Sequence, residues 1–340
     1  MRSMLGTLTL LAAAAVAAAQ EPAMDHSMMM DLGSDSASVT TTLDSIAHTV
    51  IFRAGPFSIH PMAMEGGHHE MKDHVFRVAW PMDGYLNGYA VDLVDSAGRP
   101  LDRAMIHHAG LANLERRELL VPILQRFMAA SKETAPVQLP QSIGVPVRRG
   151  DSMALFAGLH SPHGATVEGA YVVYRYPYRP AARGRPAAVV YPMHFLVGFV
   201  PGGPAAFDLV PGRSEHASEF IMPVNAHLLV AGGHVHDYAV SMRLQECASG
   251  KTLVLLKAHR RKDGTVTGLD RFVFGFHDDA LPLVKGRCYR VTATYDNPTG
   301  RTIVDGGMGS IGGPVQVDDP KDWPRLDRSD PSITLDLATL

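Results

Sequence analysis

The sequence predicts an all-β protein built from two jelly-roll-like β-sandwich domains, with one short helical insertion in the first. Many short runs alternate apolar and polar residues with the period of two that is typical of strands. The chain also contains 32 glycines and 24 prolines, which interrupt these runs. A chain of 340 residues is long enough for two domains, each with its own hydrophobic core.

The N-terminal residues 1–19 predict a signal peptide rather than a part of the fold. Arg2 precedes an apolar run from Leu5 to Val16, and three alanines before Gln20 offer a cleavage site. This run is short for a membrane span, and no later segment reaches the roughly 18–20 apolar residues that a span requires. We therefore expect an exported protein, periplasmic or secreted, without a membrane span.

Local composition divides the rest of the chain into two tails, two domains and a linker between the domains. Residues 20–45 are rich in Ser, Thr, Met and Asp, which predicts a disordered tail. The Pro-, Arg- and Ala-rich segment 179–188 is the expected linker. It would join an N-terminal β-sandwich over residues 46–178 to a C-terminal β-sandwich over residues 189–316. Residues 317–340 are rich in Asp and Pro and are expected to form a polar tail.

One stretch of the first domain has helical rather than strand spacing. Apolar residues between positions 114 and 128 recur at intervals of three and four, most clearly from Leu119 to Met128. This spacing predicts a short surface helix between strands, although Pro122 lies within it and can kink it.

The charge of the chain limits the classes of partner that it suggests, and its cysteines bear on the compartment in which it folds. The formal net charge is −3, and acidic and basic residues are well mixed, so nothing suggests a nucleic acid or an anionic membrane as partner. The two cysteines are Cys247 and Cys288. In the oxidising compartment of an exported protein we expect them to form one disulfide between neighbouring strands, the alternative being two isolated buried thiols.

Histidine and methionine are unusually frequent, at 17 residues each. Many lie between Gln20 and His74, including the run Met28-Met29-Met30 soon after the predicted cleavage site. Thioether sulfur suits Cu(I), and imidazole suits both oxidation states of copper. The enrichment therefore favours copper over zinc, although a disordered tail with chance methionine content is the alternative explanation.

A His-x-His pair, His234 and His236, opens an alternating run that continues to Leu244. In a β-strand both imidazoles would point to the same side, while Asp237 would point away from them. Two imidazoles on one face form half of a metal site. Hydrogen-bonded core histidines are the alternative.

Three further signals involve possible ligands. His107 and His108 are adjacent, so one metal ion can bind both only at a β-bulge or a strand end; otherwise one of them faces solvent. His160 ends an alternating run, and His163 competes with it three residues later. Met308 stands alone among small residues, where a flexible thioether can reach a metal or fill a gap in the packing.

Taken in order, these residues resemble the copper type II, ascorbate-dependent monooxygenases, the family of the peptidylglycine α-hydroxylating and dopamine β-monooxygenases. The shared order is a His-His pair, a histidine at the end of a strand, a linker, a His-x-His pair and a methionine in a glycine loop. The resemblance covers most of residues 75–315. Its context includes Pro81-Met-Asp-Gly84 before the His-His pair and Asn297-Pro-Thr-Gly300 before Met308.

The resemblance implies two jelly-roll sandwiches that flank a solvent-accessible cleft, two copper ions, and ascorbate as the electron donor. One copper would store an electron, and its implied ligands are His107, His108 and His160, with His163 as the alternative to His160. The other would activate dioxygen to hydroxylate a C–H bond, and its implied ligands, which are also the expected catalytic residues, are His234, His236 and Met308.

The chain also departs from the family. Gly232 stands where the peptide-amidating members have an arginine that binds a carboxylate, and glycine cannot form that clamp. Peptide amidation is therefore not expected. The animal enzymes also have many disulfides, whereas Cys247 and Cys288 allow only one here.

We expect an exported copper-dependent monooxygenase that acts with dioxygen on a small organic molecule. The alternative is a non-catalytic copper-binding or storage protein with the same fold, which the His- and Met-rich segment from Met24 to His74 favours. A zinc-dependent hydrolase ranks last, because Asp237 is the only candidate general base near the His-x-His pair. The sequence identifies neither the substrate nor the oligomeric state.

Overall fold

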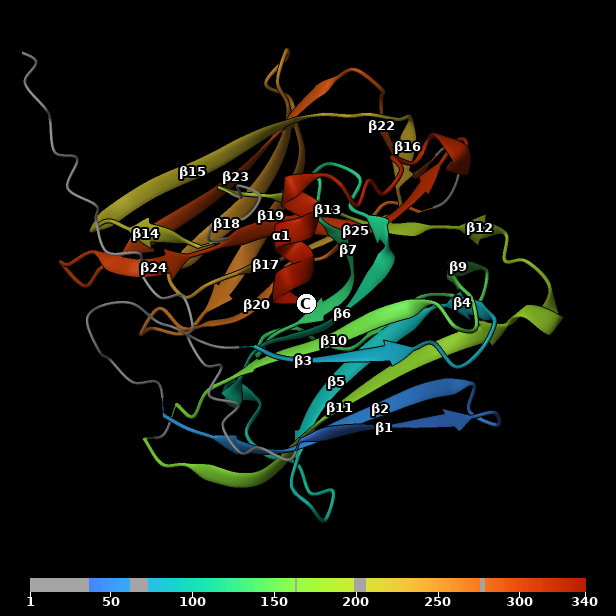
Figure 1. Ribbon diagram of the computed structural model, residues 1–340. Helices are drawn as coiled ribbons and strands as arrows, with labels where there is room; N and C mark the ends of the chain where they lie inside the picture. Colours follow the sequence, from blue (N-terminus) through green and yellow to red (C-terminus); the bar gives the residue numbers. More distant parts are fainter. Residues whose placement is uncertain (1–36, 62–72, 163, 199–205, 276–278) are drawn as a thin grey trace, which may run out of the picture. The chain divides into compact units, whose positions relative to one another are not determined.

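The computed structural model describes residues 37–61, 73–162, 164–198, 206–275 and 279–340. Strands dominate this part of the chain (Figure 1), so the prediction of an all-β sandwich fold is confirmed. Within the described residues there is a single α-helix, α1 (Pro331–Thr339). No helix in these ranges is long and apolar enough to cross a membrane.

Strands from the first half of the chain form two sheets with a shared core. One has the order β1-β2-β11-β4-β9-β12, with β5 beside β11 and β8 beside β5. Its members are β1 (Ser38–Asp44), β2 (Thr49–Ile59), β4 (Gly84–Leu86), β5 (Gly88–Val94), β8 (Val137–Gln138), β9 (Ile143–Val147), β11 (Val167–Pro180) and β12 (Ala188–Val189). The other has the order β3-β10-β6-β7. Its members are β3 (His74–Ala79), β6 (Ile106–Arg117), β7 (Leu124–Ala130) and β10 (Ser152–Leu159). Phe52, Trp80 and Leu155 belong to the buried core between them.

Strands from the second half repeat this plan. One sheet has the order β21-β17-β25-β16-β22, with β13 also paired to β25, and another has the order β15-β23-β18-β19-β20. The first comprises β13 (Tyr191–Leu196), β16 (Ala226–Leu228), β17 (Val230–Val235), β21 (Phe272–Val273), β22 (Leu281–Leu283) and β25 (Gly309–Val317). The second comprises β15 (Gly212–Ile221), β18 (Ala239–Glu246), β19 (Thr252–Arg260), β20 (Val266–Leu269) and β23 (Cys288–Asn297). A separate pair consists of β14 (Phe207–Leu209) and β24 (Ile303–Gly307).

The two halves have largely separate cores, but each core also contains a few residues from the other half of the chain. Phe195, Leu244 and Tyr295 belong to the second core, which also includes Leu119 from the first half of the chain. Leu229 from the second half belongs to the first core. Residues 35–340 form one compact unit. The division into domains over residues 46–178 and 189–316 stays a prediction, and Val190 already belongs to the first core. The predicted linker begins in β11, contains the 3₁₀ turn η2 (Ala181–Arg183) and ends in β12.

The predicted helical insertion in the first domain is wrong. In its place β6 runs to Arg117 and β7 begins at Leu124, joined by a turn in which the Glu118 N–H donates to the Ile123 carbonyl at 2.8 Å. Leu124 is buried in a small third core and Phe127 in the main core of the first half. A strand that is covered on both faces has apolar residues on both sides, and such a run imitates helical spacing.

Both predicted tails are also partly wrong. Residues 38–44 of the predicted disordered segment form β1, whose β-branched run pairs with β2 from Val39↔Ala54 to Leu43↔Val50. Residues 20–36 and the predicted signal peptide lie outside the described residues. At the other end, the Asp/Pro-rich segment contains the 3₁₀ turn η4 (Pro320–Asp322) and α1. The Asp330 side chain caps α1, because Asp and Pro are helix-start residues as well as loop residues.

The predicted disulfide is confirmed. Cys247 follows β18 and Cys288 begins β23, and their sulfurs are bonded with the Cα atoms 5.4 Å apart. The Cys247 N–H also donates to the Cys288 carbonyl at 3.0 Å. The bridge therefore joins two neighbouring strands of the second half, as expected for an oxidising compartment.

Candidate metal centre

The His-x-His pair lies at the end of β17. In the ladder with β25, His234 is opposite Ser310 and Val235 is opposite Gly309. The rings of His234 and His236 lie 5.2 Å apart between centroids. The predicted continuous strand from His234 to Leu244 is wrong, because β17 ends at Val235 and β18 begins at Ala239 in another sheet. Tyr238 makes the bend with a φ of 69°.

A buried tyrosine, Tyr295, links the backbones of Met308 and His236. The Tyr295 hydroxyl accepts hydrogen bonds from the backbone N–H groups of His236 and Met308, both at 3.1 Å, and donates to the Met308 carbonyl. Burial raises the pKa of Tyr295 to about 12, so the hydroxyl keeps the proton that it donates. One side chain thus ties together the backbones of two predicted ligands.

A β-bulge brings the first-half histidines together. Opposite β6, Gly158 pairs with His108 but Leu159 pairs with Ile106, so His107 is the extra residue. The rings of His107 and His108 lie 5.1 Å apart. His160 follows the end of β10, where its N–H donates to the Met105 carbonyl at 3.1 Å, and its ring lies 5.8 Å from that of His107. The irregular backbone needed for a joint site is therefore present. His163 lies outside the described residues.

The two predicted ligand sets meet in one cluster. The ring of His107 from the first half lies 5.4 Å from that of His236 from the second half. This contact joins His107, His108, His160, His234 and His236 into a continuous group of rings, which we call the histidine cluster. Among the described residues, no three of these histidines bring one ring nitrogen each within 4.8 Å of one another. The group that meets this criterion, Glu219 with Cys247 and Cys288, contains the disulfide sulfurs.

Burial keeps the centre of the histidine cluster uncharged. It lowers the pKa of His107 to about 2 and that of His236 to about 3, and the charges of neighbouring histidines add to both shifts. Both rings are therefore neutral at pH 7, which is the form that binds metals. Within the described part of the chain, His236 Nε2 is buried and has no hydrogen-bond partner. A buried polar atom in this state needs an explanation, and a bound metal ion would supply one.

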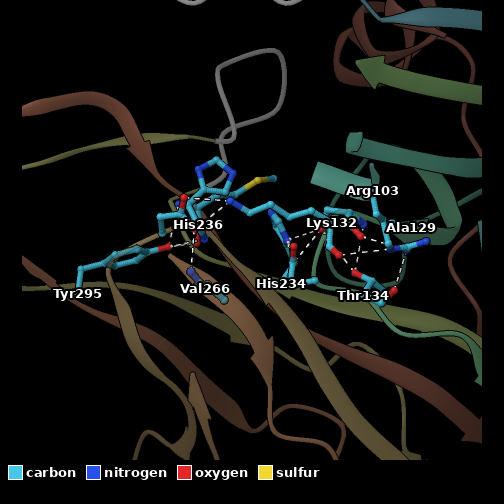
Figure 2. A network of polar contacts seen from close by, with 12 residues as sticks. Arg103, Ala129, Lys132, Thr134, His234, His236, Val266 and Tyr295 are labelled. Carbon is cyan, nitrogen blue, oxygen red and sulfur yellow. Dashed lines mark hydrogen bonds and ion pairs between the residues drawn. The ribbon is translucent and has the colours of Figure 1, made fainter. Parts of the chain in front are cut away.

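A polar loop after β7, which sequence reasoning missed, contacts the His-x-His pair. Glu133 Oε1 lies 2.7 Å from His234 Nδ1, and the Ser131 hydroxyl donates to the same carboxylate oxygen at 2.7 Å. Burial alone would raise the pKa of Glu133, but its contacts with His234 and Ser131 lower it to about 2. In the same loop Lys132 Nζ donates to the Asp237 carboxylate at 2.9 Å (Figure 2). The only sequence signal was a polar run directly after an apolar segment.

The first-half histidines have a carboxylate of their own. Both carboxylate oxygens of Asp73 lie 2.8 Å from His108 Nε2. About a third of each side chain is exposed, 36% for His108 and 33% for Asp73. No sequence pattern connects the two residues, because Asp73 precedes the edge strand β3 and contacts His108 only across the sheet.

A cavity of about 640 Å³ opens beside the histidine cluster. Its wall includes His107, His108, His234 and Met308, and apolar side chains such as Phe127 and Phe156 line much of the rest. Gly232 is also on this wall. The nearest atom to a Cβ built at Gly232 is Cγ of Arg271, at 3.8 Å. Arg271 also lines the cavity, and its guanidinium donates to the Ala135 carbonyl at 2.8 Å. An arginine thus reaches this wall from a part of the chain that sequence reasoning did not consider.

Two other histidines that could replace an assigned ligand have carboxylate partners. His194 lines the cavity, with its Nδ1 3.3 Å from a carboxylate oxygen of buried Glu118. His227 Nε2 lies 3.3 Å from the Asp318 carboxylate. His277 lies outside the described residues.

Comparisons with known proteins leave the family open. No family model and no curated protein matches this chain. Among solved structures, the major capsid protein P2 of bacteriophage PM2 is similar at 11% identity and a TM-score of 0.35, over 77% of this chain and 97% of that chain. A chain of the Sputnik virophage is similar at 10% identity and a TM-score of 0.27, over 89% of this chain and 91% of that one. Structural similarity at these scores supports no argument about function. The function therefore has to be argued from the residues of the site.

Proposed function

We propose that this protein is an exported copper protein that uses ascorbate and dioxygen to hydroxylate a C–H bond of a small organic molecule. One observation carries the proposal. Histidines from three distant stretches of the chain, at positions 107–108, 160 and 234–236, converge in one cluster. Three members of this cluster, His107, His108 and His234, line a cavity. Histidines that merely fill a core have no reason to gather in this way.

The donor groups fit copper. Neutral imidazoles with a thioether nearby suit Cu(I) and Cu(II), while zinc sites more often use thiolates or carboxylates with histidine. The buried His236 Nε2 would gain the partner that it lacks among the described residues. Because three ring nitrogens do not yet converge within 4.8 Å, we expect side-chain rotation to draw the ligands together when copper binds.

The cavity favours an enzyme over a storage protein. Copper bound at the histidine cluster would supply one-electron and dioxygen chemistry. The chain itself supplies a partly open, mainly apolar cavity of about 640 Å³, within the usual range for a small-molecule site. Its apolar wall would exclude water and hold a substrate against His107, His234 and Met308. Storage of copper requires no such space.

The test is copper counting together with ascorbate-driven oxygen uptake on the purified chain. The His236→Ala and Met308→Ala variants are compared with His259→Ala, which removes an exposed histidine paired with Asp270. We expect the wild type and His259→Ala to bind equal amounts of copper and to consume oxygen. His236→Ala should lose bound copper, and Met308→Ala should lose oxygen uptake but keep the copper held by the first-half histidines.

Two results would count against the proposal. Copper retained at the cluster without oxygen uptake would favour the storage alternative. Equal copper content in His236→Ala, a His107→Ala variant and the wild type would place the copper elsewhere, for example in the segment from Met24 to His74. That result would overturn the assignment of the site.

A further inference from the structure

Glu133 contacts His234, a half-buried histidine of the cavity wall. Its side chain is 5% exposed, while that of His234 is 25% exposed and lines the cavity. The Glu133 carboxylate oxygen that lies 2.7 Å from His234 Nδ1 also accepts the Ser131 hydroxyl, which itself lies 3.1 Å from the same ring nitrogen. A carboxylate beside a ring nitrogen acts as an acceptor, so Nδ1 is the nitrogen that carries the proton. The lone pair of His234 is then on Nε2.

The loop that carries Glu133 is braced from the first half of the chain. Arg103 lies in the 3₁₀ turn η1 (Arg103–Met105), directly before the strand of His107 and His108. Its guanidinium donates to three carbonyls of the loop, those of Ser131 at 3.2 Å, Lys132 at 3.3 Å and Thr134 at 2.7 Å (Figure 2). Three hydrogen bonds to one planar group fix the loop backbone, and with it the place of the Glu133 carboxylate.

We propose that Glu133 is a positioning residue that holds His234 with Nε2 free and directed toward the metal. Histidines that bind metals generally donate their other ring N–H to a carboxylate or a carbonyl, which fixes the tautomer and the ring orientation. The Ser131–Thr134 loop of the first half would thereby orient one of the ligands of the second half. This inference rests on the proposed function, because it requires a metal at His234.

The experiment measures copper affinity in competition with a chelator for wild type, Glu133→Ala, Glu133→Gln and Glu115→Gln. Glu115 is an exposed carboxylate of the first half that accepts the Ser152 N–H, and its variant is the matched control. Glu133→Ala should weaken copper binding about 10- to 100-fold, the range typical of lost outer-shell partners. Glu133→Gln should weaken it less, because the amide oxygen still accepts the Nδ1–H. Glu115→Gln should match the wild type.

A second readout needs no copper. Long-range ¹H–¹⁵N spectra of the copper-free protein show which ring nitrogen of His234 is protonated. We expect Nδ1–H in the wild type and in Glu133→Gln, and a mixture of tautomers in Glu133→Ala. If Glu133 were only a structural ion pair between the halves, its variants would lower the melting temperature without changing the tautomer or the copper affinity of the folded protein.

The outcomes separate this inference from the proposed function. A wild-type chain that binds no copper at the cluster refutes the proposed function, and the inference fails with it. A wild-type chain that binds copper, with Glu133→Ala and Glu133→Gln both indistinguishable from Glu115→Gln, refutes the positioning role alone. An Nε2–H tautomer of His234 in the wild type also refutes it.

Discussion

The two halves of the protein hold their histidines in different ways. Buried groups hold both the backbone and the ring of the second-half histidines, since Tyr295 binds the backbone N–H of His236 and Glu133, from a first-half loop, binds the ring of His234. In the first half, a bulge sets the backbone of His107 and His108, and a partly exposed Asp73 contacts the ring of His108. Water can replace an exposed partner but not a buried one. The difference suggests that the second half supplies the more rigid part of the site.

The largest expected contrast compares two fully buried tyrosines. Tyr295→Phe removes the partner of the His236 N–H and of both Met308 backbone groups. We expect it to lower the free energy of unfolding by about 3 kcal/mol, because each buried polar group left without a partner is costly. Tyr174→Phe, in the first core, removes one bond to the Phe156 carbonyl and should cost about 1 kcal/mol. Urea denaturation at pH 7 measures both. Equal losses would show that Tyr295 has no special role.

Acid should destabilise the copper-free protein, because each half contains a buried histidine that is neutral in the folded state. Folding lowers the pKa of His107 from 6.5 to about 2 and that of His236 from 6.5 to about 3. Below pH 6.5 the unfolded chain therefore binds more protons than the folded chain does. The free energy of unfolding then falls as the pH falls. For His236 the loss between pH 7 and pH 5 is about 2 kcal/mol. Urea denaturation at several pH values should show this slope, and His236→Gln should reduce it. An unchanged slope in His236→Gln would mean that the ring is not buried in its neutral form.

The two carboxylates that contact histidines should differ in their effect on copper affinity. Asp73→Asn should weaken copper binding less than Glu133→Gln does, and by less than about tenfold, because solvent reaches Asp73. Competition with a chelator gives both values. A larger effect at Asp73 would reverse the ranking of the two halves.

The smallest expected effect concerns the ion pair between the loop and the second half. Lys132 and Asp237 have side chains that are 35% and 37% exposed. Replacing Lys132 with methionine should therefore lower the free energy of unfolding by only about 0.5 kcal/mol. Chemical denaturation checks this value. A loss as large as that of Tyr295→Phe would show that this pair, rather than the buried groups, holds the loop.

The sequence predicted some local features around the histidines, but not how the distant segments assemble. The rings of His234 and His236 lie close together, although the strand predicted to carry both ends at Val235. The bulge that joint ligation by His107 and His108 requires is present at His107. The predicted helix failed because β7 is buried on both faces. Glu133 lies 101 residues from His234 in the chain, and no local pattern connects them.

The contact between the two predicted ligand sets also could not be predicted from the sequence. The rings of His107 and His236 meet because the elements of the two halves pack together, and that packing depends on many residues far from the site. Tyr295 was missed for a similar reason, since it is one of several tyrosines on β23 and β11, and only its hydrogen bonds to the backbones of His236 and Met308 make it important.

A crystal structure of the copper-loaded protein, with anomalous diffraction recorded at the copper edge, tests the central claim most directly. We predict anomalous density at the histidine cluster, bounded by His107, His108 and His160 on one side and by His234, His236 and Met308 on the other. Density found only outside this cluster, or none at all in protein that binds copper in solution, would contradict the account.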